Sequence, residues 1–250
     1  MASPPHLPTV TLAAVTSVAI EATVEAMHRS MRQLRFGAAK LFTDQPAPPG
    51  CHPDIEVVPI PRLSSREAYS RFMLRGMAGA IDTAHVMVVQ WDGFVLDGAR
   101  WDERWLALDY IGAPWPQFDD GMDVGNGGFS LRSRRLLAAL AELAPDTEEA
   151  EDIVIARQLR PQLEALGMRF AARETAANFA FERTRRQGTE LGFHGAFNLP
   201  GLLSARDLRW FLQRVEPGLI NPRDLRTMLA GCLVRADMGN AIRLLMRLAR

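Results

Sequence analysis

A regular alternation of strand-like and helix-like segments through the first two-thirds of the sequence restricts its fold more than any other feature. Short apolar runs are typical of strands buried on both faces, and they occur at Thr9–Val15, Ala39–Phe42, Ile55–Ile60 and His85–Trp91. Apolar residues recur every three or four positions from Ile20 to Leu34, which predicts a helix closed by Gly37. This order predicts a mostly parallel sheet flanked by helices, a Rossmann-like α/β fold.

Later segments extend this prediction. Ser64 followed by Glu67 has the pattern of a capping box at the start of the second helix, and Ser133 is expected to cap a later helix. A further short strand is predicted at Met168–Ala171. From Pro200 the pattern is helical without strands. We therefore expect one α/β domain over residues 8–200 and a small helical extension over residues 201–250.

The charge balance limits the classes of partner. The 250 residues include 29 Lys and Arg against 29 Asp and Glu, a formal net charge of zero. Non-specific binding to nucleic acid or to an anionic membrane needs clustered positive charge, so no nucleic-acid partner is expected. The sequence has two cysteines and no apolar run of the length of a transmembrane helix, and its start does not have the pattern of a signal peptide. We expect a cytoplasmic protein without a transmembrane segment.

Residues just past the predicted strands are the first candidates for a site, because ligands of open α/β sheets bind beyond the carboxyl ends of the strands. Asp92 directly follows a buried strand, in the segment Gln90-Trp91-Asp92. A carboxylate in this position can coordinate a hard divalent cation that bridges phosphate oxygens. The alternative is an ordinary Asp-Gly turn. Other strand ends place Thr16, Ser17 and Asp44 at the same edge.

Three further motifs are candidates for chemistry. The glycine-rich loop Val124–Ser133 has amides that can face an anion or a sugar hydroxyl, or it is simply a tight turn. Glu151 and Asp152 open a helix, where the helix dipole favours acids without further function; the alternative is that one of them is a general base. His194 is either a structural histidine or a metal ligand.

In this order the motifs resemble those of the GT-A-fold nucleotide-sugar glycosyltransferases. Those enzymes have an acidic metal motif of D-x-D type after a strand, a glycine-rich loop, an x-E-D motif that opens a helix, and a C-terminal histidine. The matching stretches here are Gln90–Asp92, Gly125–Gly128, Ala150–Asp152 and His194. The segments QWDGFVL, YIGAPWP, VGNGGFSLRS, EDIVI and GFHG more closely resemble an uncharacterised microbial family known as a domain of unknown function, over residues 8–200.

The resemblance implies transfer of a sugar from a nucleoside-diphosphate sugar, such as a UDP-sugar, to a hydroxyl of a glycan or small-molecule acceptor. It implies inversion, with Mn²⁺ or Mg²⁺ held by Asp92 and His194. Asp152 would take the proton of the acceptor hydroxyl, and Glu151 would be the alternative base or would orient a sugar hydroxyl. The residues that it implies for donor binding are Thr16, Ser17, Asp44, Gln90, Trp91, Asp92, Gly127 and Gly128.

One position departs from the family pattern. Gln90 stands where the D-x-D motif has its first acid, and fewer charges weaken the affinity for a divalent cation. This departure puts the metal requirement in question and leaves open a non-catalytic nucleotide- or carbohydrate-binding module on the same fold. A nucleotidyltransferase on a related sheet is a third hypothesis, which the absence of a basic glycine-rich loop after the first strand disfavours.

Overall fold

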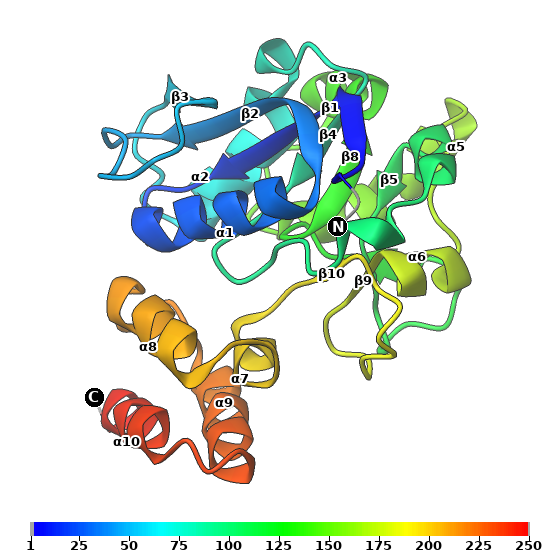
Figure 1. Cartoon of the computed structure of the whole chain (residues 1–250). Helices are drawn as coiled ribbons and strands as arrows, with labels where there is room; N and C mark the ends of the chain where they lie inside the picture. The colour runs from blue at the N-terminus through cyan, green and yellow to red at the C-terminus, as the bar shows by residue number, and fades with distance from the viewer. Residues whose placement is uncertain (1–2, 250) are drawn as a thin grey trace.

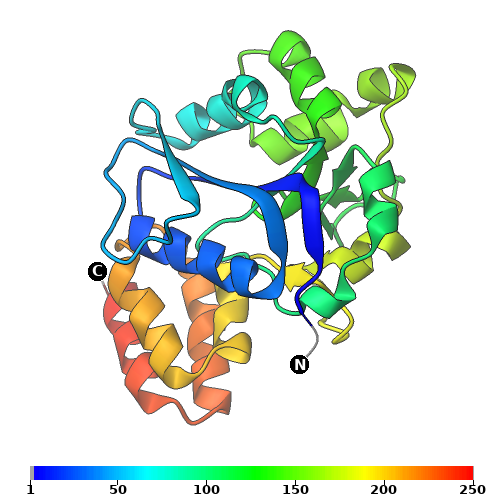
Figure 2. The ribbon, with the colours of Figure 1, turned by 45° about the horizontal axis from the view of Figure 1, so that its top comes forward.

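The computed structural model describes residues 3–249, and its centre is a six-stranded sheet with helices on both faces (Figures 1 and 2). The strands lie in the order β3-β2-β1-β4-β8-β5. Strands β3, β2, β1 and β4 are parallel, whereas β8 is antiparallel to both β4 and β5. Their bounds are β1 (His6–Val15), β2 (Arg35–Thr43), β3 (Ile55–Pro59), β4 (His85–Val88), β5 (Tyr110–Ile111) and β8 (Ser130–Ser133). The predicted mostly parallel sheet flanked by helices is confirmed.

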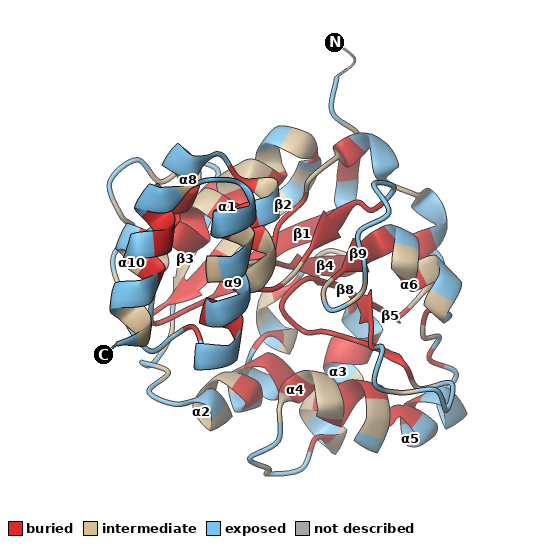
Figure 3. Ribbon diagram, turned by 90° about the horizontal axis from the view of Figure 1, so that it is seen from below, coloured by how far each residue is buried: buried red, intermediate tan, exposed pale blue. Residues whose placement is uncertain are grey.

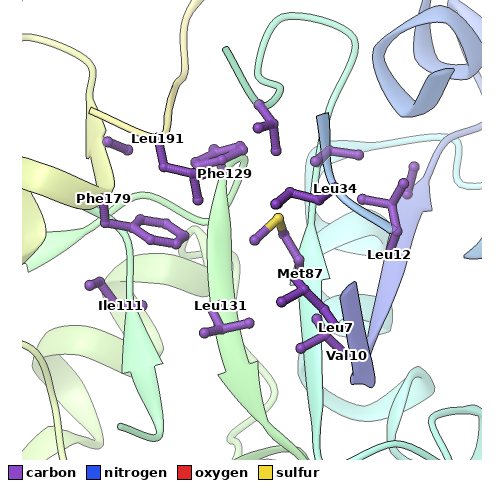
Figure 4. Close-up of a cluster of buried hydrophobic side chains, with 14 of the residues drawn as sticks. Leu7, Val10, Leu12, Leu34, Met87, Ile111, Phe129, Leu131, Phe179 and Leu191 are labelled. Atoms are coloured by element: carbon purple, nitrogen blue, oxygen red, sulfur yellow. The ribbon is translucent and has the colours of Figure 1, made fainter. Parts of the chain in front are cut away.

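The last four residues of strand β1 are all apolar because both faces of the strand are covered. Leu12 packs in a cluster with Met87 and Leu131 from β4 and β8 (Figure 4), and the same cluster includes Met27 of the first helix. Ala13 points to the other face, in a cluster formed by residues that follow the second helix. Alternate side chains of a strand point to opposite faces, so a strand between two helical layers is apolar on both sides; the exception in β1 is Thr11, whose hydroxyl is hydrogen-bonded to that of Thr83.

The helices cover the two faces of the sheet and then continue as a separate group at the C-terminus (Figure 1). Two of them, α2 and α4, are short and continue directly as π-helical turns at Phe72–Gly76 and Val154–Gln158. The bounds are α1 (Ile20–Gln33), α2 (Arg66–Arg71), α3 (Arg134–Leu143), α4 (Glu151–Ile153), α5 (Arg160–Ala165), α6 (Arg173–Phe179), α7 (Leu199–Leu202), α8 (Ala205–Arg214), α9 (Pro222–Val234) and α10 (Met238–Leu248).

Two of the sequence predictions about helix ends are wrong. Gly37 does not close α1 but lies inside β2, where a Cβ would overlap the carbonyl oxygen of Pro8; the glycine permits close pairing with β1. The cap of α2 is Ser65, whose side chain accepts a hydrogen bond from the Ala68 N–H, and not Ser64. The prediction for Ser133 is confirmed, because its Oγ accepts a hydrogen bond from the Leu136 N–H at 3.1 Å.

Other corrections concern short strands. Residues Met168–Ala171 do not form a strand; this segment pairs with Tyr110 in a single isolated bridge at Phe170. The sequence does not predict strand β8, which lies at the end of the glycine-rich segment. Its four residues include Arg132 and have no alternation of apolar and polar side chains. Outside the central sheet there are two small two-stranded sheets. One pairs β6 (Ala113–Pro114) with β7 (Val124–Gly125), and the other pairs β9 (Ala180–Phe181) with β10 (Gly192–Phe193).

The C-terminal helices pack on the α/β part through an apolar cluster of their own. This cluster joins Phe211, Met228 and Leu244 of α8, α9 and α10 to Ala22 and other small residues of α1. The N-terminal end of α1 is also tied to this group, because both carboxylate oxygens of Glu216 accept from the Ala19 N–H, at 3.1 and 3.2 Å. Within the described residues, no helix is long and apolar enough to cross a membrane.

Candidate active site

Two adjoining cavities open at the carboxyl ends of β1 and β4. The first has a volume of about 550 Å³ and is lined by the turn after β1, the segment before α2, and Gly218 and Leu219 between α8 and α9. The second has a volume of about 250 Å³ and is lined by the glycine-rich loop, the start of α4, Glu182 and His194. Arg66, Tyr69 and Gln90 line both cavities. These three side chains therefore lie where an extended ligand would pass from one cavity to the other.

Four of the predicted donor-binding residues line the first cavity: Thr16, Ser17, Gln90 and Trp91. Thr16 and Ser17 lie in its wall, where Thr16 Oγ1 accepts from the Val18 N–H at 3.1 Å and Ser17 Oγ accepts from the Leu63 N–H at 2.8 Å. These bonds shape the turn and hold the segment before α2 against it. Trp91 lines the same cavity, with its side chain half-buried. Asp44 is exposed and does not line it, so the structure does not bring Asp44 together with the other residues.

His194 lies at the centre of a polar cluster in the second cavity. Its Nε2 is 3.1 Å from Gln90 Oε1 and 3.5 Å from Asp92 Oδ1, and its Nδ1 is 3.3 Å from Glu182 Oε1. The other oxygen of Asp92 accepts a hydrogen bond from the Ala196 N–H at 3.0 Å. Burial alone would lower the pKa of His194, but the carboxylates of Asp92 and Glu182 outweigh it and hold this pKa well above its ordinary value.

The donor set of this cluster fits a divalent cation. Asp92 Oδ1 is buried and has no hydrogen-bond partner among residues 3–249. Ligands about 2.1 Å from an octahedral cation lie about 3 Å apart, which is close to the separations of His194 Nε2 from Gln90 Oε1 and Asp92 Oδ1. Glu182 faces the other ring nitrogen, the arrangement that orients a metal-ligating histidine. No group of three His, Cys, Asp or Glu side chains in the described chain is arranged to bind a metal, so the carboxamide of Gln90 would be the third ligand.

The glycine-rich loop is built for close packing. A Cβ on Gly128 would overlap the His194 ring, and a Cβ on Gly127 would overlap Glu151 Oε1. Its amides are already engaged, because the Gly127 N–H donates to Asp152 Oδ2 at 3.3 Å and the Gly128 N–H donates to Asn126 Oδ1 at 3.1 Å. In this structure both amides therefore bind side chains of the protein itself. The role of the two glycines here is to let His194 and the start of α4 approach the loop.

We expect Gly128→Ala to disturb the position of His194. The added methyl group overlaps the imidazole, so the ring or the loop must move, and overpacking of this kind costs about 1–3 kcal/mol of stability. The free energy of unfolding from urea titration measures this cost. Gly79→Ala is the control, at an exposed glycine whose added Cβ meets nothing within 4 Å; an equal cost in both variants would contradict the steric argument.

Glu151 and Asp152 have different environments at the start of α4. Glu151 is buried, and its Oε1 is 3.3 Å from NH2 of Arg132, a side chain with no exposed surface. Burial raises the pKa of Glu151, the neighbouring Asp152 adds to this shift, and Arg132 opposes it. Asp152 is only partly buried and lines the second cavity, with Oδ2 held by the Gly127 N–H. Of the two carboxylates, Asp152 is the one that a ligand in the cavity can reach.

Four residues of the site were not predicted from the sequence: Arg66, Tyr69, Arg132 and Glu182. Tyr69 accepts a hydrogen bond from Gln90 Nε2 at 2.6 Å, which directs the carboxamide oxygen of Gln90 toward His194. Burial raises the pKa of Tyr69 above its ordinary value, so the group is a neutral hydroxyl. Arg66 is exposed and forms no ion pair with any residue in the described part of the chain. No local sequence pattern marks these residues as part of a site, because Tyr69, Arg132 and Glu182 make their contacts there with residues 12 to 21 positions away along the chain.

Comparison with known proteins places the chain in a family. Residues 53–194, more than half of the sequence, match the family described as "Protein of unknown function (DUF5672)". The chain belongs to this family. The resemblance to a family of uncharacterised proteins noted from the sequence is thereby confirmed. The part that matches DUF5672 contains Gln90, Asp92, Asp152, Glu182 and His194, whereas β1 and the helices after α6 lie outside it.

For this DUF5672 member, the comparisons with curated proteins and with solved structures give weaker results. No curated protein matches the chain. Among solved structures, it is similar to one titled as a glycosyltransferase involved in the glycosylation of the major capsid of PBCV-1, at 12% sequence identity and a TM-score of 0.45. That similarity covers 75% of this chain and 92% of the other.

Proposed function

We propose that this protein transfers a sugar from a nucleoside-diphosphate sugar to a hydroxyl acceptor, with inversion at the anomeric carbon. The observation that carries the proposal is the pair of adjoining cavities, one at the carboxyl end of β1 and one that contains a reachable carboxylate and a buried histidine cluster. A donor of this class is an extended molecule with an anionic centre, and Arg66 lies at the junction of the two cavities.

In this proposal the nucleoside occupies the first cavity. Its wall supplies Trp91 for stacking against the planar base. The diphosphate then lies at the junction, where the guanidinium of Arg66 attracts it and the Tyr69 hydroxyl can donate a hydrogen bond to a phosphate oxygen. The sugar extends into the second cavity, in front of the glycine-rich loop and the start of α4. The anomeric carbon is thereby placed on the side of Asp152.

The metal in the proposal is Mn²⁺ or Mg²⁺, held by Asp92, His194 and Gln90. When bound, such a cation neutralises the diphosphate leaving group. Glu182 keeps the His194 ring oriented, and Tyr69 keeps the Gln90 oxygen directed to the same point. A histidine that holds a metal would be neutral, and the carboxylates of Asp92 and Glu182 raise the pKa of His194, so the affinity of the site for a cation would increase with pH.

Asp152 is the proposed base. Its Oδ2 takes the proton of the acceptor hydroxyl as the hydroxyl oxygen attacks the anomeric carbon and the bond to the diphosphate breaks. Because attack and departure occur on opposite sides of that carbon, a single displacement inverts its configuration. Glu151 cannot take this role without leaving Arg132, so its part is to hold Arg132 and the loop under Asp152.

The decisive experiment is a panel of UDP-, GDP- and dTDP-sugars, each tested with and without Mn²⁺. We expect one donor to bind and to undergo slow hydrolysis, with both effects requiring the metal. Asp92→Ala should weaken metal-dependent donor binding by at least about tenfold, since it removes the charged ligand. Asp119→Ala, at an exposed aspartate away from both cavities, is the matched control.

Three results would argue against the proposal. Absence of binding and of hydrolysis across the panel contradicts it altogether. Binding without turnover, even with acceptors present, favours the non-catalytic binding module, for which the neutral Gln90 is the structural reason. Release of pyrophosphate from a nucleoside triphosphate would instead identify a nucleotidyltransferase.

A further inference from the structure

Helix α10 presents large apolar side chains to solvent along one whole face. Val234, at the end of α9, is 88% exposed, and Ile242 in the middle of α10 is 54% exposed. The opposite face of α10 buries Ala241 and Leu244 against α8 and α9. We call the exposed residues the α10 stripe: Leu233, Val234, Met238, Ile242, Leu245 and Met246. A contiguous apolar patch of this kind marks an interaction surface.

The stripe lies on a strongly basic part of the chain. Residues 204–249 contain eight arginines, no lysine and four acids, although the protein as a whole is neutral. Each of the four acids is engaged in a contact within the protein: Asp207 with Arg29, Glu216 with Ala19, Asp224 with Arg183, and Asp237 with Asn240.

Most of the arginines of this segment are not neutralised. Arg206, Arg209, Arg223, Arg226 and Arg235 are exposed, and none of them forms an ion pair with another residue in the range that the structure covers. Arg235 immediately follows the first part of the stripe, and the Arg209 guanidinium is near Gly239 at the start of α10. Positive charge therefore lies on the same three helices as the stripe and borders it at Arg235 and at Arg209.

A groove with a volume of about 520 Å³ adjoins the stripe at Met246. It lies between the end of α8 and α10, and Arg214, Arg243 and Arg247 contribute to its walls. Arg247 donates to the carbonyl oxygens of Leu212 and Val215. The Nε of Arg243 is buried and has no hydrogen-bond partner within residues 3–249. This groove can receive a phosphate group next to an apolar chain.

We propose that the α10 stripe docks on the surface of an anionic lipid bilayer. An apolar helix face bordered by arginines is the arrangement that lies in the boundary between headgroups and acyl chains. Helix α10 is at the edge of the molecule (Figures 1 and 3), so a flat surface can reach its whole length. In this position the exposed arginines face lipid phosphates, and the groove beside Met246 receives one headgroup.

A second copy of the chain fits this surface less well. A two-fold dimer brings each patch against itself, which would place the unpaired arginines of one copy against those of the other. Like charges directly opposed in this way are repelled, whereas a negatively charged membrane attracts all of them. The charge around the stripe therefore selects the bilayer over the dimer.

The test is flotation of the full chain with vesicles of phosphatidylcholine alone and with vesicles that also contain phosphatidylglycerol. We expect binding only to the anionic vesicles, with a decrease as salt is raised because exposed charges are screened. Ile242→Ser with Met246→Ser, and separately Arg209→Gln with Arg235→Gln, should each reduce the bound fraction by at least about tenfold. Leu166→Ser, at an exposed leucine beyond α5, is the matched control and should bind as the unaltered chain does.

Circular dichroism and thermal unfolding test whether each variant is folded. We expect all of them to fold, because every substituted side chain is exposed. Equal binding to neutral and anionic vesicles, or no binding to either, overturns the proposal. So does a dimer in light scattering that the Ile242→Ser and Met246→Ser changes convert to monomer without any effect of lipid. The measurement does not use sugar transfer, so it is independent of the proposed enzymatic activity.

Discussion

Replacing Asp152 with asparagine is expected to abolish sugar transfer while donor binding is retained. Asparagine keeps the shape of the side chain, and its amide oxygen can still accept from the Gly127 N–H, but it cannot take a proton. Loss of a general base lowers the rate by about 10² to 10⁴-fold. Steady-state kinetics with the donor identified by the panel gives kcat, and calorimetric titration of the same donor gives its dissociation constant.

A neighbouring glutamate provides the control for the loss of turnover in Asp152→Asn. Glu148→Gln changes an exposed carboxylate three residues before α4 and should leave kcat unchanged. Turnover of Asp152→Asn at the level of the unaltered protein would exclude Asp152 as the base. A parallel loss of donor affinity would show instead that Asp152 contributes to binding.

The second large effect is expected from Arg132→Met, and it concerns stability. Arg132 is fully buried under the glycine-rich loop, where its NH2 contacts both Glu151 Oε1 and the Gly127 carbonyl oxygen. Its removal leaves the Glu151 carboxylate buried without a cation, and breaking a buried pair from one side costs about 3–5 kcal/mol. The free energy of unfolding, measured by urea titration, should fall by this amount.

A double variant separates the two contributions to this loss. Arg132→Met combined with Glu151→Leu removes both charges, and replacement of a whole buried pair by apolar residues is often neutral or stabilising. The double variant should therefore be more stable than Arg132→Met alone. Arg134→Met, at an exposed arginine at the start of α3, should change stability little. If the double variant loses as much as the single one, packing of Arg132 rather than its charge is responsible.

The sequence was sufficient to predict the sheet but not its antiparallel edge. The central parallel strands β1 and β4 are buried on both faces over most of their length and leave nearly continuous apolar runs, as at Thr9–Val15, so their pattern is visible without tertiary information. Strand β8 is held by pairing with β4 and β5 and by the burial of Arg132, and neither is encoded in a local pattern. The role of Gly37 could not be predicted for the same reason, because the residue that requires a glycine there, Pro8, is distant along the chain.

The candidate site could be predicted in part for a similar reason. Asp92, Asp152 and His194 stand in short motifs whose order is informative. The structure places Asp152 and His194 in the wall of the second cavity, and Asp92 contacts the His194 ring. Tyr69 and Glu182 do not stand in any of these motifs. They reach the site because Tyr69 of α2 contacts Gln90 just past β4, and because β9, which Glu182 follows, pairs with β10. The hydrogen bonds that the amides of Gly127 and Gly128 donate to Asp152 and Asn126 could not be predicted from a run of glycines.

The C-terminal helices are not an interchangeable appendage, because they complete a wall of the cavity proposed for the nucleoside. Gly218 and Leu219, between α8 and α9, line that cavity, and Glu216 beside them holds the first residue before α1 through both of its oxygens. A chain that ends after residue 200 would therefore lack one wall of this cavity. If α10 is bound to a membrane, the rigid connection between these helices and the cavity also fixes the distance and the angle between the membrane and the cavity opening.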